Sequence, residues 1–186
     1  MKHGVISLLA IIAGSILPPS VAGAFELKSP DVSADAPIGQ KFVYNGFGCT
    51  GENLSPELVW SDPPAGTKSF AVLVHDPDAP TGGAGWWHWA VADIPATARG
   101  LAQGAGDASG KKLPAGARQF ENDYGDAAYG GACPPPGHGA HRYNFTVYAL
   151  GVEKLDALAK VKASVVGYTI NHNALAKATL TSRYGR

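Results

Sequence analysis

The sequence has no excess of positive charge: its 186 residues include 15 lysines and arginines against 15 aspartates and glutamates. Proteins that bind nucleic acid or an anionic membrane surface need a basic patch or stripe, so both functions are disfavoured. After residue 24 no apolar run is long enough to span a bilayer, and we expect no stable membrane insertion. The chain has two cysteines, which alone make a poor zinc site.

The first 24 residues have the pattern of a secretory signal peptide. A short basic start leads into the apolar run VISLLAIIAGSIL, and the small-residue sequence VAGA ends at Ala24. A membrane anchor is the alternative, but the run is short and the cleavage signal follows it at once. We expect residues 1–24 to be removed on export to the periplasm, which leaves one soluble domain, residues 25–186.

Both cysteines lie in glycine-rich loops, Cys49 in GFGCTGE and Cys133 in GGACPPP. The oxidising compartment of an exported chain favours a disulfide between them. Closing so long a loop would stabilise the fold by about 4–5 kcal/mol in the chain-entropy model. A domain of this size does not require the bond, so two free thiols remain the alternative.

Four segments read as strands between Gly, Pro and Asp turns, namely KFVYN (41–45), SFAVLVHDP (69–77), WWHWAVADIP (86–95) and YNFTVYAL (143–150). The 69–77 segment has apolar residues in both alternating sets, which predicts a strand that is covered on both faces. The last segment alternates, which predicts one row of side chains facing the core.

The C-terminal part of the chain has a different pattern. Residues 156–173 show helical periodicity and predict one or two short helices, and ALAKATLTSRY after them predicts a closing strand. Residues 96–128 are rich in Gly, Ala, Asp and Ser and predict a long excursion on the surface. Many short strands with a little helix indicate a mainly β protein, a sandwich in one domain.

Polar residues gather in HDPDAP, at the end of the 69–77 strand. Asp76 and Asp78 are two residues apart, so they lie on the same side if the strand geometry continues. Pro77 and Pro80 fix the backbone there and donate no hydrogen bonds. An ordinary acidic turn is the alternative.

A second polar position interrupts the aromatic segment GWWHW. Strand alternation places Trp86 and His88 on one face and Trp87 and Trp89 on the other. Tryptophans in a β protein usually belong to the core, and a single histidine among them is often a buried structural residue. The segment alone therefore leaves a core role and a site role open.

The third polar segment, GGACPPPGHGAHRY, leads into the 143–150 strand. His141 and Tyr143 share a face with the core-like residues that follow, so they belong at the rim of a core-facing row. Glycines allow backbone N–H groups to approach a ligand closely and to form an anion-binding concavity. Arg142 points away and is expected to pair with a carboxylate elsewhere.

Together the three segments predict one cavity with two imidazoles, a phenol, backbone donors, a carboxylate and tryptophan walls. Donors outnumber acceptors, which suits an oxyanion such as phosphate or a carboxylate. In this cavity Asp76 would orient a histidine or accept a proton donor of the ligand.

The motifs D-P-D-A-P, W-x-H and G-x-H-R-Y, in this order and spacing, resemble the phosphatidylethanolamine-binding protein family, in its bacterial Raf-kinase-inhibitor-like (YbhB/YbcL) branch. The resemblance runs over residues 25–186. It implies a sandwich whose larger sheet is antiparallel, with short C-terminal helices flanking a small pocket. It also implies a non-catalytic protein without a cofactor that binds small anions or phosphorylated groups, modulates kinases or proteases and forms a homodimer. Carried over by motif, the ligand-binding residues are Asp76, Pro80, Trp86, His88, His141 and Tyr143, with backbone donors at Gly131 and Ala132.

Two other functions fit the same residues. A metal-dependent hydrolase would use the side chains of Asp76, Asp78, His88, His138 and His141, although the chain has no dense metal-binding motif. An interaction module, for instance a protease inhibitor, would act through an exposed loop within residues 102–128. The sequence assigns no role to His138.

Overall fold

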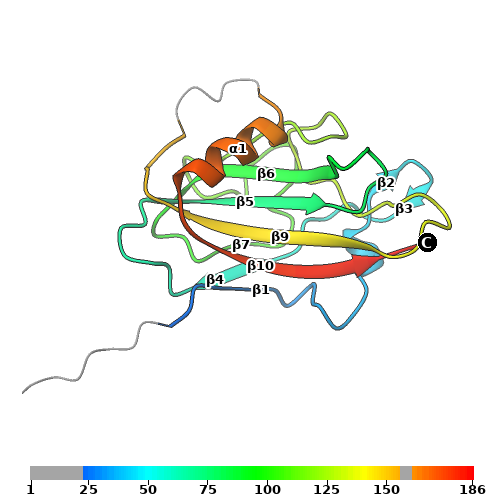
Figure 1. Cartoon of the computed structure of the whole chain (residues 1–186), viewed down its shortest axis with the longest axis horizontal. Helices are drawn as coiled ribbons and strands as arrows, with labels where there is room; N and C mark the ends of the chain where they lie inside the picture. Colours follow the sequence, from blue (N-terminus) through cyan, green and yellow to red (C-terminus); the bar gives the residue numbers. More distant parts are fainter. Residues whose placement is uncertain (1–22, 156–160) are drawn as a thin grey trace, which may run out of the picture.

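The computed structural model describes residues 23–155 and 161–186. The predicted signal peptide therefore lies almost entirely outside the described residues, as does the start of the predicted helical segment. The main element is a five-stranded antiparallel sheet in the order β10-β9-β5-β6-β8 (Figure 1). Its strands are β5 Ser69–Asp76, β6 Trp86–Pro95, β8 Arg118–Gln119, β9 His141–Leu150 and β10 Ala174–Tyr184.

A smaller sheet covers one face of this large sheet, and its three antiparallel strands are β1 Glu26–Lys28, β4 Leu58–Ser61 and β7 Gly100–Leu101. A short hairpin of β2 (Asn45–Gly46) and β3 (Cys49–Thr50) lies at one end of the molecule (Figure 1). Within the described residues, no helix has the length and apolar character to cross a membrane.

The main core lies between the two sheets. Trp60 of β4 packs against Phe70 of β5 with 5.3 Å between ring centroids, and Val72, Val91 and Phe145 of the large sheet are fully buried in the same cluster. The mainly β, antiparallel sandwich predicted from the sequence is thus confirmed.

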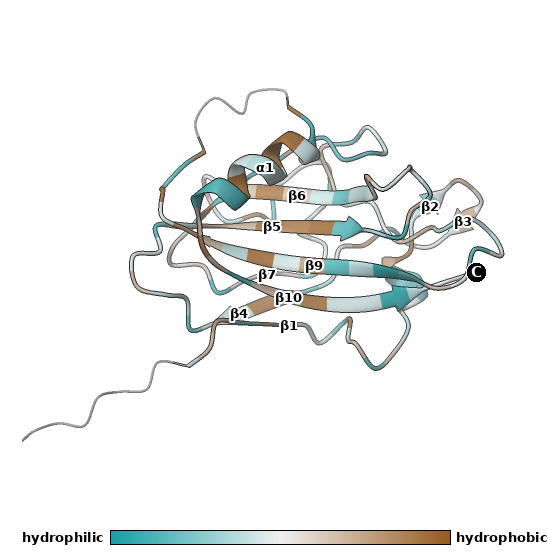
Figure 2. Ribbon diagram, in the orientation of Figure 1, coloured by the Kyte–Doolittle hydropathy of each residue, from teal (hydrophilic) through white to brown (hydrophobic). Residues whose placement is uncertain are grey.

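The only α-helix among the described residues, α1 (Ala163–Asn173), covers the opposite face of the large sheet. Its buried residues Val166 and Ile170 share a second cluster with Leu73 of β5 and Ala90 of β6. Both faces of β5 are therefore covered, as predicted, and Figure 2 shows this strand hydrophobic along most of its length and hydrophilic at its end.

The predicted bounds agree closely with β5, β6 and β10, whereas β9 begins two residues earlier than expected, at His141. The predicted strand at 41–45 is wrong: Gln40–Phe42 form a 3-10 helix, and β2 begins only at Asn45. The exposed excursion predicted for 96–128 is also wrong in part, because this segment contributes β7, β8 and buried residues that include Leu101, Ala105 and Phe120.

A β-bulge in β6 changes the alternation expected for the tryptophans. Val74 pairs with Trp89, but the next residue, His75, pairs with Trp87, so His88 is an extra residue in the ladder. Trp89 consequently faces the core between the sheets while Trp87 faces α1, and the prediction that they share a face is wrong. His88 lies on the Trp89 side, with its ring 5.1 Å from that of Tyr143.

Candidate functional site

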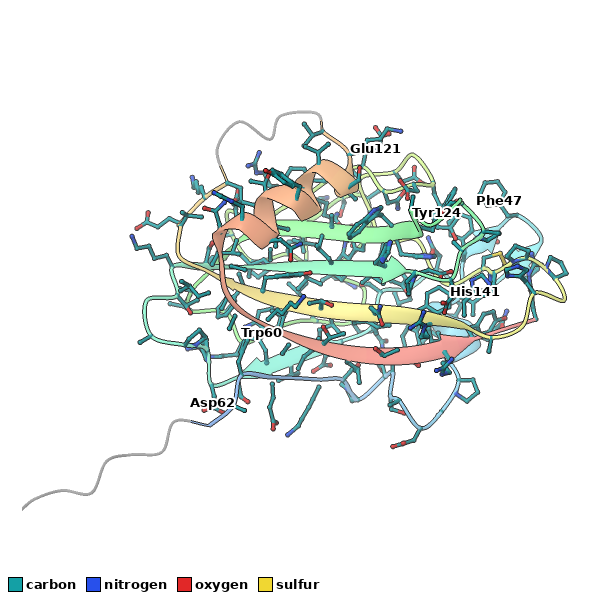
Figure 3. All side chains as sticks on the ribbon, viewed as in Figure 1. Phe47, Trp60, Asp62, Glu121, Tyr124 and His141 are labelled. Carbon is teal, nitrogen blue, oxygen red and sulfur yellow. A yellow bond between two sulfur atoms is a disulfide. The ribbon has the colours of Figure 1, made fainter. Side chains whose placement is uncertain are left out.

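A cavity of about 470 Å³ opens at the end of the sandwich where β5 ends and β6 and β9 begin. In an antiparallel sheet these three strand ends meet at one edge, so residues far apart in sequence come together. Figure 3 shows Phe47, Tyr124 and His141 at this end of the molecule. The lining residues are Phe47, Asp76, Ala79, Pro80, Thr81, Trp86, His88, Tyr124, Cys133, Pro134, Pro135, Pro136, His141 and Arg186.

Five of the eight predicted site residues line this cavity: Asp76, Pro80, Trp86, His88 and His141. The structure therefore brings the three sequence motifs together at one opening. The described residues of α1 are absent from the lining, because the helix covers the other face of the sheet. This corrects the expectation that helical elements flank the pocket.

A chain of hydrogen bonds runs along one side of the cavity. Nδ1 of His141 lies 2.7 Å from Oδ2 of Asp76, and Nε2 of His141 lies 2.7 Å from Nδ1 of His138. Asp76 and His141 are both buried, and His138 is exposed. Asp76 thus orients a histidine, as expected, and both nitrogens of His141 already have partners. His138 is the outermost residue of this hydrogen-bonded series.

Asp78 does not share the position of Asp76, because β5 ends at Asp76 and the chain turns. The Asp78 N–H donates to Oδ1 of Asp76 over 2.8 Å. The Asp78 carboxylate points outward and accepts from the Arg142 side chain at Nε (2.9 Å) and Nη2 (2.6 Å), and these hydrogen bonds lower the pKa of Asp78. Arg142 therefore pairs with a carboxylate outside the cavity, as predicted.

The His88 ring is fixed by the segment that the sequence proposed as a source of backbone donors. Its Nδ1 lies 2.8 Å from the Gly130 carbonyl oxygen and 3.1 Å from that of Gly131, so this nitrogen carries the proton. Burial lowers the pKa of His88 to about 4 and keeps the ring neutral near pH 7. The other nitrogen, Nε2, is then a hydrogen-bond acceptor.

Three buried polar atoms in or behind the cavity wall have no hydrogen-bond partner among the described residues: Trp86 Nε1 and His88 Nε2 of lining residues, and the hydroxyl of Tyr143 beside His88. Tyr143 lies behind the lining, 1% exposed, beside the Cys133 main chain, and burial raises its pKa. A buried polar atom without a partner is costly, so each one calls for an explanation such as a bound ligand, ion or water molecule. The set combines a donor, an acceptor and a hydroxyl that can act as either.

Gly131 and Ala132 do not line the cavity. The Gly131 N–H donates to Oδ1 of Asn53 over 2.7 Å, and the Ala132 carbonyl accepts from the Tyr44 N–H over 3.1 Å. The Gly131 N–H is thus used by the fold, and the contribution of Gly131 to the site is the carbonyl that holds His88. A Cβ at Gly131 would lie 2.4 Å from the Tyr44 nitrogen, which explains the glycine.

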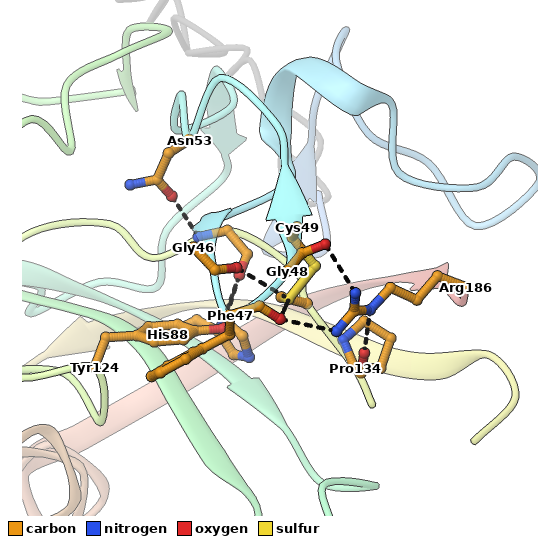
Figure 4. The surroundings of a disulfide bond; sticks show 11 residues. Gly46, Phe47, Gly48, Cys49, Asn53, His88, Tyr124, Pro134 and Arg186 are labelled. Carbon is orange, nitrogen blue, oxygen red and sulfur yellow. Dashed lines mark hydrogen bonds between the residues drawn. A yellow bond between two sulfur atoms is a disulfide. The ribbon is translucent and has the colours of Figure 1, made fainter. Parts of the chain in front are cut away.

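The mouth of the cavity is formed by residues that the sequence motifs did not indicate, among them Phe47, Tyr124 and Arg186. A disulfide joins Cys49 to Cys133, as predicted, and brings the β2–β3 hairpin against the loop of prolines 134–136 (Figure 4). The predicted disulfide could therefore have indicated a role for Phe47, which lies two residues before Cys49. No comparable signal exists in the sequence for Arg186.

The sequence motifs also allowed for a metal centre. Within residues 23–155 and 161–186, no group of three or more His, Cys, Asp or Glu side chains is arranged to hold a metal ion. The partners of the histidines in the cavity are instead a carboxylate, another imidazole and backbone carbonyls.

Comparison with known proteins gives the family. The model of the phosphatidylethanolamine-binding protein family matches residues 28–185, nearly the whole described chain. The chain belongs to the phosphatidylethanolamine-binding protein (PEBP) family.

Relatives in Escherichia coli support this assignment. The chain is 49% identical over 163 residues to the PEBP relative YbcL, with 88% of each chain covered, and 43% identical over 159 residues to YbhB, with 86% of this chain and 99% of YbhB covered. The crystal structure of YbcL, described as a member of the mammalian PEBP family, superposes with a TM-score of 0.84 at 48% identity, over 87% of this chain and 98% of YbcL. The PEBP fold is a ligand-binding fold.

Proposed function

We propose that the chain is a non-catalytic binding protein whose cavity takes a small anionic or phosphorylated ligand, with a regulatory role. The observation that carries the proposal is the pair of Trp86 Nε1 and His88 Nε2, two lining residues whose buried atoms lack partners among the described residues. A protonated oxyanion matches this pair, because one of its oxygens accepts from the indole while its O–H donates to the neutral imidazole. The cavity volume of about 470 Å³ suits a small ligand.

The test is Trp86→Phe, which removes the indole donor and keeps an aromatic ring. Titration calorimetry with phenyl phosphate should show about tenfold weaker binding than wild type, the value of one lost hydrogen bond to a charged group. The matched control is Trp87→Phe, since Trp87 faces α1 on the other side of the sheet and should leave the affinity within about twofold. Equal affinity of wild type and Trp86→Phe would contradict the proposal.

One observation favours an enzyme as the second candidate. The hydrogen-bonded series from Asp76 through His141 to His138 could draw a proton from a water molecule, as a hydrolase requires. Hydrolysis of p-nitrophenyl phosphate by purified protein, measured with and without added divalent metal, separates the candidates. Turnover that disappears in His141→Ala would favour the hydrolase over the binding protein.

We further propose export to the periplasm and assembly as a homodimer. The Cys49–Cys133 disulfide supports export, because such bonds persist in oxidising compartments. A 38% identical relative in Mycobacterium tuberculosis, LppC, is named as a candidate lipoprotein. A regulatory target of an exported chain would then be met outside the cytoplasm. Cell fractionation and light scattering of the purified protein test the two proposals separately.

A further inference from the structure

Arg186 is held at the mouth of the cavity by three carbonyl groups. Its Nε donates to the Pro134 oxygen over 2.7 Å, Nη1 to the Gly48 oxygen over 3.0 Å and Nη2 to the Phe47 oxygen over 3.1 Å (Figure 4). The main-chain oxygen of Arg186 also accepts from the Gly137 N–H over 2.9 Å. The guanidinium group is therefore fixed in one orientation before any ligand arrives.

The Arg186 guanidinium keeps donors that the fold does not use. Within the described part of the chain it forms no ion pair with a carboxylate, and it is the one lysine or arginine in the cavity wall. The carboxylate in the lining, Asp76, already bonds to His141 and to the Asp78 N–H. A guanidinium has five N–H donors, so two remain after the three carbonyl contacts, one on each Nη. A fixed guanidinium with free donors suits an oxyanion.

Apolar side chains line the mouth near Arg186. Phe47 is 72% exposed beside it, with its ring 5.7 Å from that of Tyr124, and the backbone of Phe47 has a φ of 51°, a left-handed conformation that few non-glycine residues adopt. Pro135 and Pro136 also line the cavity. A ligand that contacts Arg186 therefore meets a cation and an apolar wall at the same place.

We propose that Arg186 selects the charge of the ligand and Phe47 its apolar part, so that the cavity prefers an oxyanion carrying an apolar substituent over the bare ion. This inference rests on the proposed binding function and adds two recognition residues that lie outside the three sequence motifs. It also assigns the two groups separable roles, since Arg186 acts through charge and Phe47 through apolar contact.

The experiment compares two probes, phenyl phosphate and inorganic phosphate, by titration calorimetry. Wild type should bind phenyl phosphate several-fold more tightly. Arg186→Gln should weaken both probes by about tenfold while the preference for phenyl phosphate remains, and Arg186→Lys should recover part of the loss. Phe47→Ala should remove the preference and leave inorganic phosphate within about twofold. The matched control is Arg183→Gln, an exposed arginine of β10 that lies outside the lining and should change neither affinity.

The outcomes separate a binding role from a structural one. If Arg186→Gln abolished the preference for phenyl phosphate as well, Arg186 would only hold the mouth in shape, and the inference would be overturned. Unchanged affinities in Arg186→Gln with normal binding by wild type would also overturn it, while leaving the proposed function intact. Failure of wild type to bind either phosphate would overturn the proposed function and this inference together.

Discussion

At the scale of single residues, the protonation of His88 decides what the inner end of the cavity offers. Its Nδ1–H is committed to the carbonyls of Gly130 and Gly131, so only the lone pair on Nε2 faces a ligand. Burial holds the pKa of this ring at about 4. The site therefore presents an acceptor at neutral pH, and a second proton on the ring would place a positive charge in the interior without a counter-ion bonded to Nε2.

This titration predicts an acid-sensitive contribution to stability. Between pH 6.5 and 4 the unfolded chain binds a proton on His88 that the folded chain does not, so the free energy of unfolding falls as the pH is lowered through this window. The loss from pH 7 to pH 4.5 is on the order of 2 kcal/mol. Urea unfolding at the two pH values should show a smaller loss in His88→Gln than in wild type.

Measuring the difference between two pH values removes any constant effect of the substitution. The control is His172→Gln on the exposed part of α1, which should reproduce the wild-type difference. The same pH-dependent loss in His88→Gln as in wild type would show that other groups cause it.

At the scale of elements, the β2–β3 hairpin and the loop that begins at Cys133 form the mouth as a pair. The disulfide between Cys49 and Cys133 closes 84 residues of chain, which corresponds to about 4–5 kcal/mol in the chain-entropy model. We expect Cys49→Ser/Cys133→Ser to lose several kcal/mol in urea unfolding, with the carbonyl contacts of Arg186 still present in the folded state.

A thiol assay on the denatured, oxidised protein supplies the control for this prediction. The assay should detect no free thiol in wild type, whereas two reactive thiols per molecule would contradict the Cys49–Cys133 disulfide. A double variant as stable as wild type would show that the closure of this loop contributes little.

Elements whose faces are set by their own residues could be predicted from the sequence. The bounds of β5, β6 and β10 follow from apolar runs and turn residues. The bulge at His88 could not be predicted, because it depends on how β6 pairs with β5. The strand expected at 41–45 failed for a related reason: Phe42 and Val43 are buried by contacts with distant segments, and not by a strand ladder of their own.

The same distinction applies to the site. Asp76, His88 and His141 stand near the ends of predicted strands, so their convergence follows from an antiparallel sheet. Phe47 and Arg186 belong to segments whose positions are fixed by the disulfide and by carbonyl contacts. No local pattern in the sequence encodes those contacts.

At the scale of the whole molecule, the large sheet separates two apolar clusters. The cavity opens at the end of the layer between the sheets, and α1 lies on the other side with Val165 and Tyr168 exposed. Ligand recognition and the surface of α1 should therefore be independent. We expect Tyr168→Ser to leave the affinity for phenyl phosphate within about twofold, measured by calorimetry.

Light scattering on the same samples reports the assembly state. A Tyr168→Ser protein that lost affinity would contradict the separation of the two faces. A change of mass with unchanged affinity would instead place the subunit contact on the α1 side, away from the cavity.

The mouth of the cavity is held by both a disulfide and the hydrogen bonds of Arg186, and this has a practical consequence. The disulfide and the guanidinium contacts join the same two segments, so we expect either one to keep Phe47 near Pro134 when the other is missing. We therefore expect protein produced in the bacterial cytosol, where glutathione keeps cysteine thiols reduced, to form the mouth of the cavity without the disulfide. Oxidation after secretion would then lock an arrangement that folding has already reached.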